Sequence, residues 1–127
     1  MDVEQQVSKI LIVDDENEVR SLMGLMLARR NFEVEEASGG REALTKVSKS
    51  KPDIILLDIN MPDLDGFEVH RRLKSKETTK NIPVIFCTAM RIPDIINSVK
   101  SSSDDYIRKP FRSEELHQKI EEVLNRR

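Results

Sequence analysis

The chain has 127 residues, of which 38% are hydrophobic and 35% are charged, and 21 basic side chains nearly balance 23 acidic ones to give a net charge of −2. This composition suits one folded domain of ordinary size and excludes a disordered chain. The near balance of charge also excludes strong attraction of the whole surface to nucleic acid or to an anionic membrane.

Short apolar runs alternate with amphipathic stretches from the start of the chain. Residues 10–13 are a continuous apolar run, which predicts a strand buried on both faces as in a parallel sheet. A helix is predicted next, because apolar side chains recur three and four residues apart at Val19, Leu22, Met23 and Met26. The two methionines are expected to lie in the core. Asn31 can end this helix in the left-handed conformation, and residues 32–37 are a weaker strand candidate.

The same alternation continues to the end of the chain. Three further strands are predicted at residues 54–57, 84–87 and, more weakly, 105–107. The helices that accompany them are marked by apolar stripes at Ala43, Leu44 and Val47, at Phe67, Val69 and Leu73, at Ile92, Ile95, Ile96 and Val99, and at Leu116, Ile120, Val123 and Leu124. Ser113, which precedes two glutamates, is the predicted N-cap of the last helix.

A strand followed by a helix, five times over, predicts an α/β fold: a doubly wound (βα)5 domain with a five-stranded parallel sheet covered on both faces. We expect right-handed crossovers and one domain over residues 1–127. Cys87 is the single cysteine and the N-terminal residues lack the core of a signal peptide, which favours a reducing cytoplasm. The apolar runs of about five residues are too short to cross a membrane.

Ligands of such sheets bind outside the carboxyl ends of the strands. The residues at these ends are Asp14 and Asp15, Asp58, Thr88 and Lys109.

Three carboxylates repel one another unless a proton or a cation relieves the repulsion, and a set of oxygen ligands alone suits Mg²⁺. A metal, a lysine and a hydroxyl can together hold a phosphoryl group, and a carboxylate among them can be the nucleophile that forms an acyl phosphate. Asp58, which closes the central strand, is the candidate. Each residue is ordinary alone; their joint placement favours this interpretation.

These motifs resemble the receiver domains of two-component response regulators. The similarity covers nearly the whole chain and rests on Ile-Leu-Ile-Val-Asp-Asp-Glu at residues 10–16, on residues 53–66, on Thr88-Ala89 and on Asp-Tyr-Ile-Arg-Lys-Pro-Phe at residues 105–111. It implies a flavodoxin-like fold with strand order 2-1-3-4-5. It also implies a cis peptide bond between Lys109 and Pro110.

The resemblance implies a phosphorylation-controlled switch that catalyses only its own phosphorylation and dephosphorylation. Asp58 would take its phosphoryl group from a sensor histidine kinase or a phosphotransfer protein. The implied ligands of Mg²⁺, or of Mn²⁺ in its place, are the carboxylates of Asp15 and Asp58, the backbone carbonyl of Asn60 and, mostly through water, Asp14. The groups implied to hold the phosphoryl oxygens are Lys109, Thr88 and the backbone N–H of Ala89.

The resemblance also implies how phosphorylation is transmitted. Thr88 turns towards the phosphoryl group, which adds about −1.5 to −2 charge, and Tyr106 rotates into the vacated space. The output face would comprise residues 93–101, 105–107 and 113–125. It would bind an effector protein or effector domain, or a second copy of the chain in a phosphorylation-dependent dimer. We expect no direct binding of nucleic acid or membrane by this domain.

Two departures from the family pattern lie in the sequence between Thr88 and Tyr106. Ser102 and Ser103 replace the usual Gly-Ala, and the loop after Thr88 is about one residue short. Met90 stands where family members tune the lifetime of the phosphoryl group, and we expect its apolar side chain to limit the access of water.

Other residues have plainer interpretations. Cys87 is expected to be a buried small hydrophobe, and His70 and His117 are expected on the surface. Two alternatives remain open for the chain as a whole. It is the N-terminal receiver of a DNA-binding transcriptional regulator, or it is an aspartate-nucleophile phosphohydrolase of the haloacid dehalogenase type. The latter requires a general acid where Asn60 stands.

Overall fold

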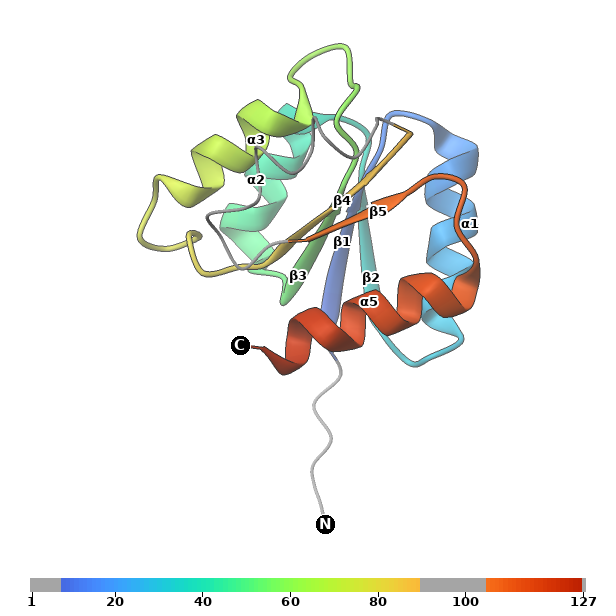
Figure 1. Ribbon diagram of the computed structural model, residues 1–127. Helices are drawn as coiled ribbons and strands as arrows, with labels where there is room; N and C mark the ends of the chain where they lie inside the picture. Colours follow the sequence, from blue (N-terminus) through green and yellow to red (C-terminus); the bar gives the residue numbers. More distant parts are fainter. Residues whose placement is uncertain (1–7, 90–104, 127) are drawn as a thin grey trace.

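The computed structural model describes residues 8–89 and 105–126, and within them it confirms the predicted α/β fold (Figure 1). Five parallel strands lie in the order β2-β1-β3-β4-β5, as expected. The strands are β1 Lys9–Val13, β2 Glu33–Ala37, β3 Ile54–Leu57, β4 Val84–Thr88 and β5 Asp105–Arg108. The helices of the described residues are α1 Asn17–Ala28, α2 Gly40–Ser50, α3 Gly66–Lys74 and α5 Ser113–Asn125. The helix predicted around residues 92–99 lies outside the described residues.

The sheet has a separate apolar core on each face, which explains why its strands are continuous apolar runs. Alternate side chains of a strand point to opposite faces, so every position of a doubly covered sheet is buried. On one face, Leu11, Ile55 and Phe86 pack with residues of α2 and α3. On the other, Ile12 and Leu56 pack with α1 and α5. Figure 1 shows the two helix pairs on opposite sides of the sheet.

Several local predictions can be compared with the structure. Asn31 has a φ of 67°, which confirms the left-handed conformation after α1. Cys87 is 2% exposed, and burial raises the pKa of its thiol, as expected of a buried hydrophobe. Met23 is buried as predicted, whereas Met26 is only half-buried. Within the described residues, no helix is long and apolar enough to span a membrane.

Two predictions about α5 are wrong. The N-cap is Arg112, one residue before the predicted Ser113, and its backbone N–H donates to Glu115 Oε1 at 3.0 Å. Because the Glu115 carboxylate satisfies this N–H, the helix begins at Ser113 rather than after it. His117 is 5% exposed rather than on the surface, and its Nε2 lies 2.9 Å from the backbone carbonyl of Met26. The imidazole is buried because α1 supplies that partner. His70 is half-buried beside the ring of Phe86.

The loop between β3 and α3 is tied to α2 by Asp63. Its carboxylate accepts hydrogen bonds from the backbone N–H groups of Gly40 and Arg41, both at 3.1 Å, and these bonds hold the pKa of Asp63 below its ordinary value. Asp63 therefore satisfies N–H groups at the start of α2 that have no acceptor within the helix.

We expect Asp63→Ala to lower the free energy of unfolding by about 1 kcal/mol at pH 7, as does the loss of a helix cap. Because the pKa is lower in the folded state, this contribution is complete above the ordinary aspartate pKa of about 4 and is lost as the pH falls through the lowered value. Urea unfolding of both proteins at several pH values tests this. A difference that stays constant down to pH 2 would contradict it.

Candidate functional site

The parallel register brings the carboxylates that follow β1 and β3 together. Val13 pairs with Leu57, and the backbone N–H of Asp58 donates to the Val13 carbonyl at 2.9 Å. Oxygen atoms of Asp14, Asp15 and Asp58 consequently lie within 4.8 Å of one another. Asp14 is 1% exposed and Asp58 is 8% exposed, whereas Asp15 faces solvent. The three acidic residues predicted from the strand ends thus form one cluster, which is open on one side.

Lys109 reaches this cluster from the end of β5. Its backbone N–H donates to the Thr88 carbonyl at 2.9 Å, which continues the pairing of β5 with β4. Its Nζ lies 2.6 Å from Asp14 Oδ2 and 3.6 Å from Asp58 Oδ2. The peptide bond between Lys109 and Pro110 is cis, as the resemblance implies. The predicted lysine therefore stands between two of the carboxylates.

The charges of the cluster are not balanced. Burial, with a contribution from the charge of Asp14, raises the pKa of Asp58 above its ordinary value, although Lys109 acts in the opposite direction. Burial alone would lower the pKa of Lys109, but its hydrogen bond to Asp14 and the charge of Asp58 raise it, so the lysine stays protonated. With all four groups ionised, three negative charges and one positive charge leave a formal charge of −2.

The donor set fits Mg²⁺. A hollow of about 320 Å³ opens over the cluster and is lined by Asp15, Glu16, Asp58, Asn60, Ala89 and Lys109. Its acidic lining offers oxygen atoms, which hard divalent cations prefer, and a divalent cation would cancel the formal charge of −2. Asp58 Oδ1 accepts the backbone N–H of Ile59 at 2.7 Å, while Oδ2 is the oxygen nearer to Lys109.

The two residues predicted to form the switch share one face of the sheet. Thr88 is fully buried at the carboxyl end of β4. Tyr106 pairs with Phe86 on the neighbouring strand β5 and is half-buried against the α2 and α3 side of the core. Because Phe86 and Thr88 are two residues apart, all three side chains point the same way. Ala89 follows Thr88 directly and lines the hollow. Met90, Ser102 and Ser103 lie outside the described residues.

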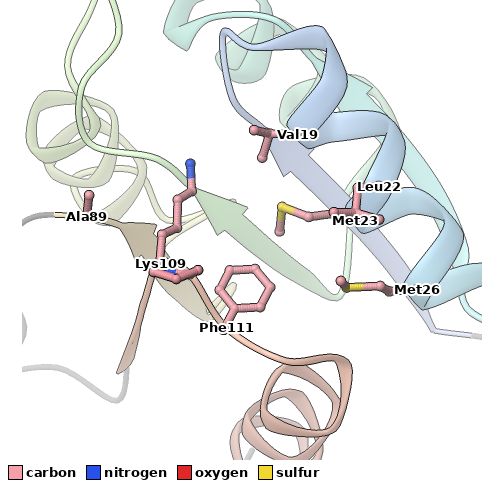
Figure 2. A pocket seen from close by; sticks show the side chains of 8 residues that line it. Val19, Leu22, Met23, Met26, Ala89, Lys109 and Phe111 are labelled. Atoms are coloured by element: carbon pink, nitrogen blue, oxygen red, sulfur yellow. The ribbon is translucent and has the colours of Figure 1, made fainter.

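A second hollow, which the sequence does not predict, adjoins the first. It measures about 370 Å³, and the residues that line it are Val19, Leu22, Met23, Met26, Ala89, Lys109, Pro110 and Phe111. Figure 2 shows Met23 and Met26 extending from α1 towards Phe111, with the Nζ of Lys109 directed away from that ring. We call it the α1 groove. The sequence predicts only Met23 and Met26 of this apolar stripe for the core, and Leu22 on the same stripe is 55% exposed.

Comparison with known proteins agrees with this geometry. Residues 10–121 match the family described as the response regulator receiver domain. The chain is 38% identical over 125 residues to the probable transcriptional regulator ycf27 of Pyropia yezoensis, an overlap of 98% of this chain and 50% of that protein. It is also 38% identical over 120 residues to the transcriptional regulatory protein ResD of Bacillus subtilis, an overlap of 94% of this chain and 49% of ResD.

Among solved structures, the chemotaxis protein CheY4 of Vibrio cholerae superposes with a TM-score of 0.86 at 32% identity, covering 93% of this chain and 99% of that one. The flavodoxin-like fold is therefore confirmed. The chain spans about half the length of the curated relatives that it matches.

Proposed function

This chain belongs to the response regulator receiver domain family, and we propose that its phosphoacceptor residue is Asp58. The observation that supports this assignment most strongly is the placement of Asp58. Its carboxylate lies at the centre of the sheet edge, within 4.8 Å of the oxygens of Asp14 and Asp15 and 3.6 Å from the ammonium group of Lys109. It is a carboxylate nucleophile beside both a candidate metal site and a fixed positive charge.

The proposed reaction transfers a phosphoryl group from a phosphohistidine to Asp58. An Asp58 oxygen attacks phosphorus, the P–N bond breaks, and the departing imidazole keeps the electron pair of that bond and takes up a proton. Lys109, Thr88 and the Ala89 N–H would hold the phosphoryl oxygens. Lys109 stays protonated beside the carboxylates and so supplies charge where the phosphoryl oxygens would lie. The chain would catalyse this transfer and the later hydrolysis, and no other reaction.

Mg²⁺ would be held by Asp15 and Asp58, by the backbone carbonyl of Asn60 and, mostly through water, by Asp14. Mn²⁺ could take its place, since both ions accept oxygen ligands. When bound, the ion would neutralise oxygen atoms of the phosphoryl group during transfer. The fit rests on the solvent-open, acidic hollow described above.

Phosphorylation would then change the output face through Thr88 and Tyr106. The described members of that face are β5 and α5, while residues 93–101 lie outside the described part of the chain. We propose that the face binds an effector protein, an effector domain or a second copy of the chain. The transcriptional roles in the names of ycf27 and ResD belong to proteins about twice as long as this chain. The phosphohydrolase alternative is not favoured, because an amide stands at Asn60 where that chemistry needs an acid.

The proposal is tested by incubating the chain with phosphoramidate, a small phosphodonor, and measuring its intact mass. We expect one phosphoryl adduct when Mg²⁺ is present and none when a chelator removes it. The same adduct is expected from a phosphorylated histidine kinase. An adduct that forms equally well without a divalent cation would contradict the proposed metal dependence.

The partner that carries the phosphohistidine would dock on the α1 groove. The partner's histidine must reach Asp58. The partner surface around that histidine must therefore contact the part of this chain that borders the hollow over Asp58. The α1 groove shares Ala89 and Lys109 with the hollow over Asp58, and its lining is mostly apolar. An apolar partner surface would therefore bury Leu22, which is 55% exposed in the free chain.

We expect Leu22→Ala to slow transfer from a histidine kinase or phosphotransfer protein about tenfold, because a buried apolar contact of this kind contributes roughly 1–2 kcal/mol to association. Phosphorylation by phosphoramidate should not change. Leu25→Ala is the matched control, since Leu25 is 62% exposed on the same helix but does not line the groove. Equal slowing by both variants would contradict a specific role for the groove.

A further inference from the structure

Arg20 joins three elements beside the acidic cluster without lining the hollow. It lies in α1, and its side chain is only 13% exposed. Its Nη1 donates to the backbone carbonyl of Asp14 at 2.7 Å, its Nε to Glu36 Oε1 at 3.2 Å, and its Nη2 to Asn17 Oδ1 at 2.6 Å. The guanidinium therefore links the end of β1 to α1 and to the edge strand β2.

The bond to Asp14 fixes a particular peptide group. The carbonyl of Asp14 belongs to the peptide that joins Asp14 to Asp15, and it lies just beyond the last paired residues of β1 and β2, Val13 and Ala37. The side chain of Asp14 is held separately, by Lys109 Nζ and by the backbone N–H of Glu16. Asp15 is exposed, so the direction of its carboxylate depends on the orientation of this peptide.

Arginine has properties here that lysine lacks. The guanidinium presents several N–H groups in a planar fork, so it can bind three acceptors in different directions at once. Lysine would carry the same charge but has a single nitrogen. The ion pair with Glu36 adds a fixed support, because Glu36 belongs to β2 and pairs with Ile12 of β1. The fork is therefore anchored to the sheet rather than to the helix alone.

We propose that Arg20 is a positioning residue for the Mg²⁺ site: it holds the peptide between Asp14 and Asp15 so that both carboxylates face Asp58 before the ion binds. This inference rests on the proposed function, since it assumes that the acidic cluster binds Mg²⁺. Ordered ligands lose less freedom on binding, so losing the fork should weaken metal binding without altering the groups that contact the phosphoryl group.

The test compares the wild-type chain with Arg20→Lys and Arg20→Ala. Mg²⁺ affinity is measured by calorimetric titration, and phosphorylation by phosphoramidate is followed over a range of Mg²⁺ concentrations. We expect both variants to bind Mg²⁺ about tenfold more weakly, as is typical when a residue that supports metal ligands is replaced. The Mg²⁺ concentration for half-maximal rate should rise by the same factor, while the rate at saturating Mg²⁺ stays close to that of the wild type.

Arg29→Lys is the control, because Arg29 is exposed at the end of the same helix. Unchanged affinity in both Arg20 variants would overturn the inference. So would wild-type affinity in Arg20→Lys alone, because charge without the fork would then suffice. If the Arg20 variants do not fold, Glu36→Ala decides instead, because it removes the acceptor of Arg20 Nε: a loss of Mg²⁺ affinity supports the inference and wild-type affinity overturns it. Failure of the wild-type chain to bind Mg²⁺ would instead contradict the proposed function.

Discussion

Asp58→Asn is expected to abolish phosphorylation completely and, at the same time, to make the chain more stable at neutral pH. The amide removes the nucleophile, so neither phosphoramidate nor a histidine kinase should add a phosphoryl group. The gain in stability follows from the environment of Asp58, which is 8% exposed and lies beside Asp14. Its raised pKa means that the folded state disfavours the charged form, and an uncharged amide escapes this cost.

The pH dependence of that gain has a definite sign. A group whose pKa is raised in the folded state costs stability once the pH exceeds its ordinary value, which is about 4 for aspartate. The difference in stability between Asp58→Asn and the wild type should therefore vanish below that pH, grow as the pH rises from about 4 to the raised pKa, and stay constant at higher pH. Urea unfolding without Mg²⁺ measures it. Because Mg²⁺ binds only the wild type well, adding it should narrow the difference.

Asp65→Asn is the matched control for Asp58→Asn. It makes the same chemical change seven residues away, at the N-cap of α3, where Asp65 accepts the backbone N–H of Glu68 at 2.9 Å. Asparagine caps helices about as well as aspartate. Asp65→Asn should therefore keep wild-type phosphorylation and nearly wild-type stability. Loss of phosphorylation in this control would show that the effect is not specific to Asp58.

Gly66→Ala is expected to lower the free energy of unfolding by about 1–3 kcal/mol, the usual cost of forcing an extra carbon into a packed site. Gly66 begins α3, and its N–H donates to the Ile59 carbonyl at 2.8 Å. A Cβ at this position would collide with the backbone carbonyl of Asp58 and would lie 2.7 Å from Ile59 Cα. These atoms are backbone, so the strand end that carries Asp58 must move.

The displacement of Asp58 should also slow phosphorylation by phosphoramidate. Gly24→Ala is the control, and it should raise the free energy of unfolding rather than lower it. A Cβ at Gly24, within α1, would meet only Glu36 Oε2, at an ordinary contact distance of 3.7 Å. Alanine favours a helix over glycine by about 1 kcal/mol, so Gly24→Ala should be more stable and fully active. A wild-type unfolding midpoint for Gly66→Ala would contradict the collision.

The sequence predicts the site well because the site residues directly follow the strands, and in a parallel sheet all strands end at the same edge. Asp14, Asp58 and Thr88 each stand at the end of a strongly apolar run, and the carboxyl ends of parallel strands share one edge. Their meeting with Lys109 follows from the strand order, which the family resemblance supplied. The roles of these residues in phosphoryl transfer stay predictions until they are measured.

The features that the sequence did not reveal depend on contacts between side chains and backbone in distant elements. His117 looks like a surface residue in a charged helix, yet the Met26 carbonyl of α1 gives it a buried partner. Arg20 likewise meets Asp14 and Glu36 only after β1, α1 and β2 have packed together. Periodicity predicts which face of a helix is apolar, but it does not state which carbonyl a neighbouring element offers.

Locating the phosphoryl group tests the central claim most directly. The wild-type chain is phosphorylated with phosphoramidate and Mg²⁺ and then treated with borohydride, which reduces an acyl phosphate of aspartate to homoserine. Peptide mass spectrometry then locates the reduced residue. We predict homoserine at position 58 and at no other aspartate, and only in the sample that contained Mg²⁺. Homoserine at Asp14 or Asp15, or an adduct that borohydride leaves unchanged, would contradict an acyl phosphate on Asp58.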